Sequence, residues 1–413
     1  MSGLNAHGNA ISVIGNNISN VNTVGFKASR ATFADTLSQA LSGGGIRVGR
    51  GVQLSSVNPI FEQGSFETTS SPTDMAIDGG GYFVAKNSDG TFYTRAGQFS
   101  LDKSGKLATP DGLVAQGFLF DSAGTEAGTT SDIVLSSKTS APKTTSKVTI
   151  TALLDAGASI TTFNATTPAT TSNFSSTITA YDSLGKAHTV NLYFSKTSAT
   201  AWGWHALVDG GEITGGTAGT NVEAGTGTLT FTTAGALSAE TTSLSDFDFK
   251  DAAQNQVLTF DYGTSVTEGG SGLTGTTQFS GTSSIITQQQ DGYGVGTLSS
   301  LETNQEGIIS GRYSNGQIQK LARIAIATFA SPEGLSLKGK NLYQETVNSG
   351  QPSVGKPGSS GRGSIASSSL ELSNVDLAAE FVNLIKIQQG FQANTKIVTT
   401  TNELLSELVN LKR

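Results

Sequence analysis

The chain has 413 residues, of which 51 are glycine and 14% are charged, with no cysteine, three histidines and a net charge of −7. The absence of cysteine excludes disulfides, thiolate nucleophiles and cysteine-based metal sites, and three histidines leave little material for a histidine-based centre, so we expect no catalytic, cofactor-binding or metal-binding residues. The acidic balance argues against nucleic acid and acidic membrane surfaces as partners, and no apolar run approaches the roughly 18 residues that span a bilayer, so we expect no membrane insertion.

The first 25 residues predict one amphipathic helix of about 20 residues. Apolar side chains recur on one helix face at intervals of seven, three, four and three residues. Gly25 is typical of a helix end, because glycine adopts the left-handed conformation without strain. The apolar residues of this stripe are Leu4, Ile11, Ile14, Ile18 and Val21.

A second stripe begins at Leu377 and continues to Val409 in alternating steps of four and three residues. Most positions are apolar, while Gln388, Thr395 and Asn402 share one of the two seams, where polar residues favour a defined register. At 1.5 Å per residue this helix would be about 55 Å long, more than a small domain needs, so it must find partners along its length. The apolar members are Leu377, Phe381, Leu384, Phe391, Val398, Leu405 and Val409.

Between the helices the pattern changes to the alternation that is typical of β-strands. Asp-Gly pairs at 89–90 and 111–112 predict hairpin turns, and a similar texture returns between 291 and 346. The stretch 122–290 is richer in serine and threonine and predicts a separate all-β insertion. Its candidate strands are Lys147–Ala152, Thr177–Tyr181, His188–Phe194, Thr228–Thr232 and Gln256–Tyr262.

Together these patterns predict a nested, multi-domain chain that is mainly β with α-helical termini, since the length favours several domains over one. The predicted domains are a terminal helical (coiled-coil) assembly domain at 1–41 and 364–413, an inner β-domain with linkers at 42–121 and 291–363, and an outer β-domain insertion at 122–290. We interpret the Gly/Ser-rich segments 42–51 and 349–363 as linkers that join the helices to the β-body and act as hinges.

The terminal helices favour self-assembly. Gly8, Gly15 and Gly390 weaken them by about 1 kcal/mol each relative to alanine, so we expect them to be largely disordered in a free monomer and to fold against identical neighbours. A helix that meets a different face on the next copy makes a heterologous contact, and such contacts build an open helical filament. The apolar residues of both stripes are therefore the candidate subunit-interface residues. The alternative is that the helices pack on each other or on the β-body as ordinary core.

Several long motifs resemble the axial proteins of the bacterial flagellum, its rod and hook proteins. That family's N-terminal signature is similar to IGNNISNVNTVGFK (Ile14–Lys27), and its C-terminal signature to SNVDLAAEFVNLIKIQQGFQANTKIVTTTNELL (Ser373–Leu405). The inner-domain motif shared by rod and hook proteins resembles DMAIDGGGYFVA (Asp74–Ala85) followed by YTRAGQFSLDKSG (Tyr93–Gly105). The segments that resemble hook proteins in particular are Thr179–Phe194, Asp291–Gln317 and Ala322–Thr346.

The family usually has a short lead before its Ser-Gly-Leu-Asn-Ala segment, whereas Ser2 directly follows Met1 here, so we expect a shortened N-terminal helix or export segment.

The resemblance implies a structural role without catalysis or cofactors: a self-assembling hook subunit whose curved, flexible tube joins the rod to the filament and transmits torque. It also implies partners, namely further copies of the chain, the distal rod, hook cap and hook–filament junction proteins, and the flagellar export apparatus. The expected location is the extracellular flagellum, reached unfolded through the flagellar channel. This route agrees with an N-terminus that lacks the blocks of a cleavable signal peptide and with the absence of cysteine.

Three alternatives remain open. A distal rod protein is the nearest, although rod proteins of this family lack a large second β-domain, which would leave 122–290 unexplained. A secreted adhesin or carbohydrate-binding protein fits the Thr/Ser/Gly-rich middle but leaves both terminal stripes unexplained. An enzyme is the weakest alternative, because no catalytic motif is present. Asp246, Asp248 and Asp251 miss the spacing of a calcium loop, and Trp202 and Trp204 are expected in the core of the outer domain.

Overall fold

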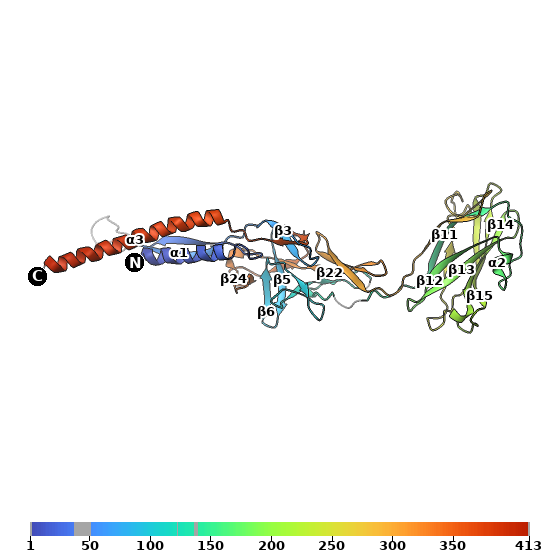
Figure 1. Cartoon of the computed structure of the whole chain (residues 1–413), viewed down its shortest axis with the longest axis horizontal. Coiled ribbons are helices and arrows are strands. Elements are labelled where there is room, and N and C mark those ends of the chain that lie inside the picture. The colour runs from blue at the N-terminus through green and yellow to red at the C-terminus, as the bar shows by residue number, and fades with distance from the viewer. Residues whose placement is uncertain (1, 37–50, 122, 136–138, 412–413) are drawn as a thin grey trace. The chain divides into compact units, whose positions relative to one another are not determined.

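The computed structural model describes residues 2–36, 51–121, 123–135 and 139–411 (Figure 1). The chain divides into two compact units. Unit 1 comprises Met1–Lys138, Ser299–Arg312 and Ile318–Arg413, and unit 2 comprises Thr139–Leu298 and Tyr313–Gln317. The predicted fold class is confirmed, since strands make up most of the regular structure and long helices lie near both ends.

The two predicted terminal helices are present in unit 1 as α1 (Ser2–Ser19) and α3 (Leu377–Leu411). Both stripes therefore form helices, as their periodicity predicts. The structure nevertheless places these helices in the same compact unit as the inner strands, where the sequence predicts a separate helical domain.

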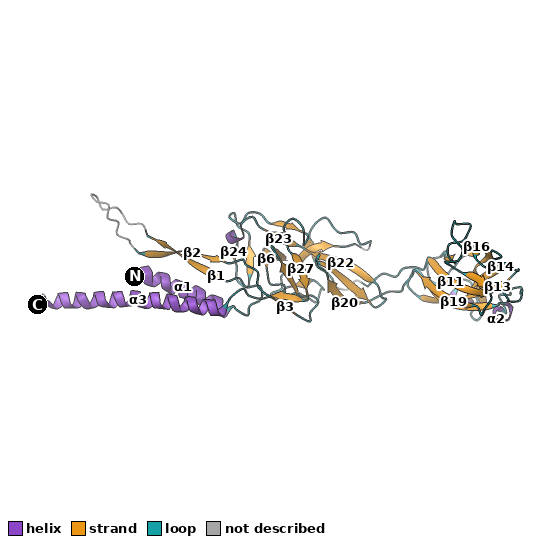
Figure 2. Ribbon diagram, turned by 90° about the horizontal axis from the view of Figure 1, so that it is seen from above, coloured by secondary structure: helices purple, strands orange, loops and turns teal. Residues whose placement is uncertain are grey.

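A hairpin that the sequence does not predict packs beside α1. Strands β1 (Ser29–Asp35) and β2 (Val52–Pro59) pair antiparallel from Ser29 opposite Pro59 to Asp35 opposite Val52, with an irregularity after Thr32 (Figure 2). Strand β1 thus lies within the range assigned to the helical domain. Of the predicted linker 42–51, residues 42–50 lie outside the described residues.

The main sheet of unit 1 runs in the order β20-β21-β22-β9-β5-β6-β25-β24, and further short strands pair beside this path. The predicted hairpin at Asp89-Gly90 joins β5 to β6, whose core side chains Tyr82, Val84 and Tyr93 pack with Tyr343. The strands of the sheet are β5 (Tyr82–Asn87), β6 (Gly90–Thr94), β7 (Ser100–Leu101), β8 (Leu107–Ala108), β9 (Val114–Leu119), β10 (Ser131–Asp132), β20 (Leu298–Thr303), β21 (Ile308–Tyr313), β22 (Ile318–Ile324), β23 (Ile326–Thr328), β24 (Ser336–Leu337), β25 (Leu342–Gln344) and β26 (Ser353–Gly355).

The linker interpretation of 349–363 is wrong, because this segment is bound to the sheet along its length. Its β26 pairs with β23, the N–H of Gly363 donates to the carbonyl of Gly80 over 2.7 Å, and Lys356 Nζ lies 2.6 Å from Glu126 Oε2. Glycine and serine carry no side-chain signal for such contacts, which are made mainly by the backbone. The segment therefore does not have the freedom of a hinge.

The chain continues from this segment into two more strands before α3 begins. Strand β27 (Ser364–Ser367) pairs with β4 (Met75–Asp78), and β28 (Ser369–Glu371) pairs with β3 (Phe66–Thr68). The range assigned to the C-terminal helical domain thus starts with strands. Pairing with the N-terminal half of the chain is a long-range contact that local patterns do not reveal.

Unit 2 consists of two sheets around one core. One sheet has the order β12-β13-β14-β15-β16, and in the other β11 pairs with β17, β18 and β19. The elements are β11 (Lys147–Asp155), α2 (Pro168–Thr171), β12 (Phe174–Tyr181), β13 (Ala187–Lys196), β14 (Ala201–Asp209), β15 (Asn221–Phe231), β16 (Leu237–Ser245), β17 (Thr259–Asp261), β18 (Thr277–Phe279) and β19 (Ser284–Gln290).

The core of unit 2 contains both tryptophans of the chain, as predicted. Trp202 and Trp204 are buried on β14, and the indole N–H of Trp202 donates to Gln278 Oε1 on β18 over 2.9 Å. This bond joins the two sheets and satisfies a polar group that burial would otherwise leave unpaired. Because unit 1 has no tryptophan, tryptophan fluorescence reports the unfolding of unit 2 alone.

One partly buried carboxyl of unit 2 titrates near neutral pH. Burial raises the pKa of Glu240 from 4.5 to about 7, and the neighbouring carboxylates of Asp261 and Glu268 add to this rise. The N–H of Tyr262 donates to Glu240 Oε2, and this bond together with Lys147 opposes the rise without cancelling it. The native state therefore binds a proton at Glu240 more tightly than the unfolded chain does, and unit 2 loses stability as the pH rises from about 4.5 to 7.

We predict that Glu240→Gln stabilises unit 2 at pH 8 by about 2 kcal/mol, because the substitution removes a carboxylate that is ionised in a partly buried site. Near pH 4.5 the effect should largely vanish, since the native carboxyl is then protonated. Urea unfolding followed by tryptophan fluorescence at both pH values measures the difference.

The matched control is Asp246→Asn, which removes an exposed carboxylate whose side chain makes no hydrogen bond or ion pair among the described residues. This control should leave the stability of unit 2 unchanged at both pH values. An equal stabilisation by Glu240→Gln at pH 4.5 and pH 8 would contradict the assignment.

Candidate assembly site

One face of helix α1, which consists mostly of small side chains, is buried in unit 1. The buried residues of α1 are Ala6, Ala10, Ile14 and Asn17, which recur at intervals of four, four and three residues. Short side chains let a neighbouring helix approach closely. This buried face is rotated from the predicted stripe, and only Ile14 belongs to both.

Helix α3 packs antiparallel to α1 along its first half. Asn17 Nδ2 donates to Glu380 Oε1 over 3.3 Å, the ring of His7 faces Gly390, and Gly3 faces Asn394. A Cβ atom built on Gly390 would lie 2.8 Å from Cε1 of His7, so a larger residue there would require the His7 ring to move. The alternative left open by the sequence, that the helices pack on each other, therefore describes this half of α3.

The N-terminal stripe is divided between the inside of the chain and its surface. Ile14 is buried, and Val21 packs against a small cluster formed by Phe26, Ala28 and Val375. Leu4, Ile11 and Ile18 stay partly exposed. The role of these residues as subunit-interface residues stays a prediction.

The C-terminal stripe is divided along the length of α3. Leu384, Phe391 and Val398 are partly buried, whereas Leu377 and Phe381 are 40% and 50% exposed. From Thr399 to Asn410 every side chain is exposed, including Leu405 at 55% and Val409 at 68%. The second half of α3 therefore has an apolar stripe that no described part of the chain covers.

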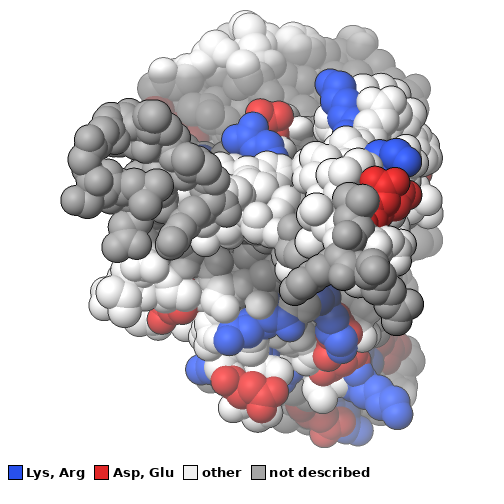
Figure 3. All heavy atoms as spheres, turned by 90° about the vertical axis from the view of Figure 1, so that its left-hand side faces the viewer, with Lys and Arg blue, Asp and Glu red and all other residues white. Residues whose placement is uncertain are grey.

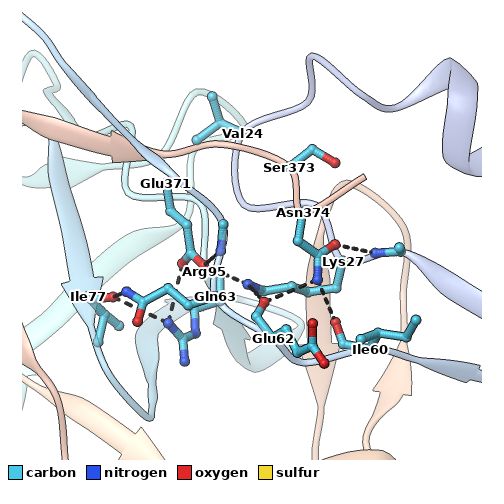
Figure 4. A network of polar contacts seen from close by, with 12 residues as sticks. Val24, Lys27, Ile60, Glu62, Gln63, Ile77, Arg95, Glu371, Ser373 and Asn374 are labelled. Carbon is cyan, nitrogen blue, oxygen red and sulfur yellow. Dashed lines mark hydrogen bonds and ion pairs between the residues drawn. The ribbon is translucent and has the colours of Figure 1, made fainter. Parts of the chain in front are cut away.

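The helix pair is tied to the sheet by a buried ion cluster at the base of both helices (Figure 4). The carboxylate of Glu371, fully buried at the end of β28, lies between two cations: Oε1 is 2.6 Å from Lys27 Nζ and Oε2 is 3.3 Å from Arg95 Nη1. Lys27 follows the exit from α1, and Arg95 follows β6. Segments that are far apart in the sequence are thus joined by one side chain.

Backbone groups complete the cluster. The N–H of Gly64 donates to Glu371 Oε1 over 3.0 Å, Lys27 Nζ donates to the carbonyl of Glu62 over 2.7 Å, and Arg95 Nη2 donates to the carbonyl of Gly79 over 2.8 Å. Burial lowers the pKa of Lys27, although its hydrogen bond to Glu371 opposes this effect. A buried carboxylate with this many donors holds its geometry, because each group that moved would leave a buried charge or dipole unpaired.

Two asparagines extend these contacts to the helices. Asn374 Oδ1 accepts from the N–H of Ala28 over 2.8 Å, and its Nδ2 donates to the carbonyl of Ile60 over 2.9 Å. Asn17 accepts from the N–H of Ser29 and donates to the carbonyl of the same residue, which attaches α1 to the first residue of β1. Each asparagine side chain therefore bonds both a backbone N–H and a backbone carbonyl. It holds together segments that do not pair as strands of one sheet.

Sequence reasoning missed the members of this cluster as functional residues. Lys27, Arg95 and Asn374 stand inside motifs that carry the family resemblance, but no spacing rule connects them with Glu371. A charged residue next to buried apolar ones, as at Phe26-Lys27 and Leu370-Glu371, is the only local signal.

The surface of the described residues carries charges of both signs. On the face shown in Figure 3, acidic and basic side chains lie interspersed among uncharged ones. The described residues include no group of three or more histidine, aspartate or glutamate side chains arranged to hold a metal ion. Among the described helices, none combines the length and the apolar character that crossing a membrane requires.

We predict that Glu371→Gln destabilises unit 1 by about 3–5 kcal/mol, because Lys27 and Arg95 would keep their buried charges without the carboxylate. Urea unfolding measures the loss. Circular dichroism follows both units and tryptophan fluorescence follows unit 2 alone, so the change should appear in circular dichroism but not in fluorescence. Adding Lys27→Met to this variant should restore part of the stability.

The matched control, Glu67→Gln, removes an exposed glutamate on β3 that makes no ion pair among the described residues. It should change the stability of unit 1 by less than about 0.5 kcal/mol. Equal effects of the two substitutions would show that the cluster does not anchor the helices.

We further predict that Gly8→Ala stabilises the helix pair more than Gly390→Ala does. Gly8 has open space where a Cβ would stand, so alanine should stabilise α1 by up to about 1 kcal/mol. At Gly390 the added methyl group would displace His7 and push the helices apart, which should cancel or reverse that gain. The helix signal of the unassembled chain during thermal unfolding measures both; a gain at Gly390 as large as that at Gly8 would contradict the close contact.

Comparison with known protein families matches four segments of the chain, all to flagellar domains. Residues 1–27 match the family described as "Flagella basal body rod protein", and 366–411 match "Flagellar basal body rod FlgEFG protein C-terminal". Residues 76–153 match "Flagellar hook protein FlgE/F/G D1 domain", and 149–293 match "Flagellar basal body protein FlaE D2 domain". The first two segments contain α1, Lys27, Glu371 and α3.

Individual proteins are similar along the whole chain. The flagellar hook protein FlgE of Borreliella burgdorferi is 36% identical over 450 residues, covering 100% of this chain and 98% of the relative. That of Treponema pallidum is 33% identical over 461 residues with the same coverage. The crystal structure of Helicobacter pylori flagellar hook protein FlgE2 is similar with a TM-score of 0.46 and 17% identity, covering 72% of this chain and 98% of that one. With 36% identity along its full length to a hook protein, and with flagellar domains matched at both ends and in the middle, the chain belongs to the flagellar hook protein family.

Proposed function

We propose that the chain is the structural subunit of a flagellar hook and that the α1–α3 pair is the element through which copies assemble. The single observation that carries this proposal is the exposed apolar surface on the second half of α3. Soluble monomers rarely expose an apolar stripe on a long helix without a partner for it. Polymerisation would bury this stripe without any change in the rest of unit 1.

The anchored base of the helix pair supports the same role. A subunit of a tube under torque must pass force from its assembly element to its body, and the buried cluster around Glu371 connects the two through ion pairs and hydrogen bonds. Contacts between a helix of one copy and another face of the next copy would be heterologous and would grow an open tube. Such a tube would join the rod to the filament, with the distal rod, hook cap and hook–filament junction proteins as the neighbouring partners.

For unit 2 we propose a role at the surface of the tube. Its Gly/Ser/Thr-rich strands would make weak, hydrated contacts between copies, which can exchange as the tube bends and rotates. Unit 2 also favours a hook protein over a distal rod protein, because a separate inserted β-unit with its own core has no place in the rod alternative. We further propose that the chain catalyses no reaction and reaches the extracellular flagellum unfolded, through the flagellar export channel.

We predict that deletion of residues 399–413 yields a folded chain that does not polymerise. The contacts between α1 and α3 end near Asn394, so the deletion leaves the helix pair and the cluster around Glu371 intact. A deletion of 1–30 and 372–413 would be less informative, because it removes Lys27 and leaves Glu371 buried beside Arg95 alone. Sedimentation and electron microscopy of the purified full-length and shortened chains measure assembly.

A finer variant, Leu404→Ser with Leu408→Ser, removes only apolar surface from the helix and should also abolish polymers. Its control is Leu337→Ser with Val347→Ser, which replaces two exposed apolar residues elsewhere in unit 1. The proposal fails if the full-length chain stays monomeric at its highest soluble concentration, or if the shortened chain forms the same tubes.

A further inference from the structure

We infer that the tip of α3 from one copy docks into a groove between α1, α3 and β1 of the next copy, guided by acidic residues on the tip and basic residues on the groove. This inference rests on the proposed assembly role and deepens it, because it names the two surfaces that meet. The occupant to which it commits is a second copy of this chain.

The groove has a volume of about 300 Å³ and lies wholly within unit 1. Ala10, Ile14 and Ile387 contribute apolar surface to it, and Arg30 on β1 and Lys386 on α3 are the cations that line it. The Arg30 and Lys386 side chains are exposed, and neither has an ion pair or a hydrogen bond among the described residues. The groove therefore combines an apolar surface with two cations that make no ion pair among the described residues, and the carboxylate of Glu380 also lines it.

One polar atom of the groove is buried without a partner. Glu380 Oε1 accepts from Asn17, whereas Glu380 Oε2 is shielded from solvent and has no donor among the described residues. A buried acceptor without a donor is unfavourable by itself. The surface is therefore incomplete in the single chain, and a neighbour with hydroxyl or amide donors would complete it.

The tip of α3 has the complementary character. Between Thr399 and Leu411 the charged residues are Glu403 and Glu407, four residues apart on one side of the helix. Leu404 and Leu408, which are 57% and 62% exposed, lie directly beside them. Neither glutamate has an ion pair among the described residues. An apolar stripe bordered by acids is the counterpart of an apolar groove bordered by bases.

The tip cannot fill the groove of its own chain. About 20 residues of continuous helix separate Ile387 from Leu408, which at 1.5 Å per residue is a distance of about 30 Å along one rod. Contact between the two surfaces must therefore be made between copies. The copy whose tip is docked keeps its own groove free, and the copy that receives it keeps its own tip free, so each contact leaves a site for the next.

The experiment uses two full-length charge-reversal variants. The groove variant carries Arg30→Glu and Lys386→Glu, and the tip variant carries Glu403→Lys and Glu407→Lys. Each variant alone would place like charges against each other in every contact, so each should need at least about tenfold more protein than the original chain to form polymers. Mixed in equal amounts, the two variants should polymerise near the original concentration, because each groove then meets a tip of opposite charge.

A control variant, Lys103→Glu with Glu306→Lys, reverses two exposed charges elsewhere in unit 1 that make no ion pair with any residue the structure describes, and it should polymerise as the original chain does. Circular dichroism and tryptophan fluorescence verify that all variants fold. Asn383→Cys with Thr401→Cys adds a direct test that leaves Leu404 and Leu408 in place: the natural chain has no cysteine, so oxidation of the polymers of this variant should give disulfide-linked ladders of many copies.

Polymerisation of either reversed variant at the original concentration, or a mixture that assembles no better than its components, would overturn this docking. In those outcomes the original chain still polymerises and the proposed function stands. If the original chain itself does not polymerise, the proposed function fails and the docking fails with it.

Discussion

The carboxylate of Glu371 is the interaction on which the arrangement of unit 1 depends. It is buried between Lys27 and Arg95, so it joins the exit of α1, the end of β6 and the end of the last strand before α3. A buried ion pair adds little net stability compared with apolar packing, but removing one partner is strongly unfavourable. The cluster therefore acts mainly by specifying geometry: other placements of the two chain ends would leave a charge buried without its counter-ion.

This constraint changes how flexibility in an assembled hook is to be understood. Segment 349–363, which by composition resembles a hinge, is held by β26, by Gly363 and by the ion pair of Lys356 with Glu126. The helix pair is likewise fixed to β1 through Asn17 and to the inner strands through Asn374. Compliance in unit 1 is therefore not located at these junctions. Contacts between copies, which are not fixed by buried charges within the chain, are the better place for the sliding that bending requires.

The sequence predicts the elements that are determined by residues close together along the chain. Both terminal helices, the hairpin at Asp89-Gly90 and several strands of unit 2 follow from spacing and turn residues, because neighbouring residues determine them. The missed features join positions far apart in the sequence. Gly390 lowers the stability of an isolated helix, yet its lack of a side chain leaves the space that the ring of His7 occupies. Lys27 and Glu371 are 344 positions apart. The pairing of β28 with β3 and the contacts of 349–363 are made mainly by the backbone, so the sequence shows no side-chain pattern that would predict them. Such contacts require the fold before they can be identified.

The heptad pattern of α3 shows that periodicity predicts a helix face but not what surrounds it. One uninterrupted apolar stripe lies in two different environments. Leu384 and Phe391, on the half of α3 that packs on α1, are partly buried, whereas Leu405 and Val409 continue the same stripe into solvent. Periodicity cannot distinguish these halves, since a helix from the same chain and one from a neighbour offer the same kind of apolar surface. Length can: α1 has 18 residues and α3 has 35, so about half of α3 extends past its partner. The excess of one terminal helix over the other thus marks the part of the chain that depends on a second copy.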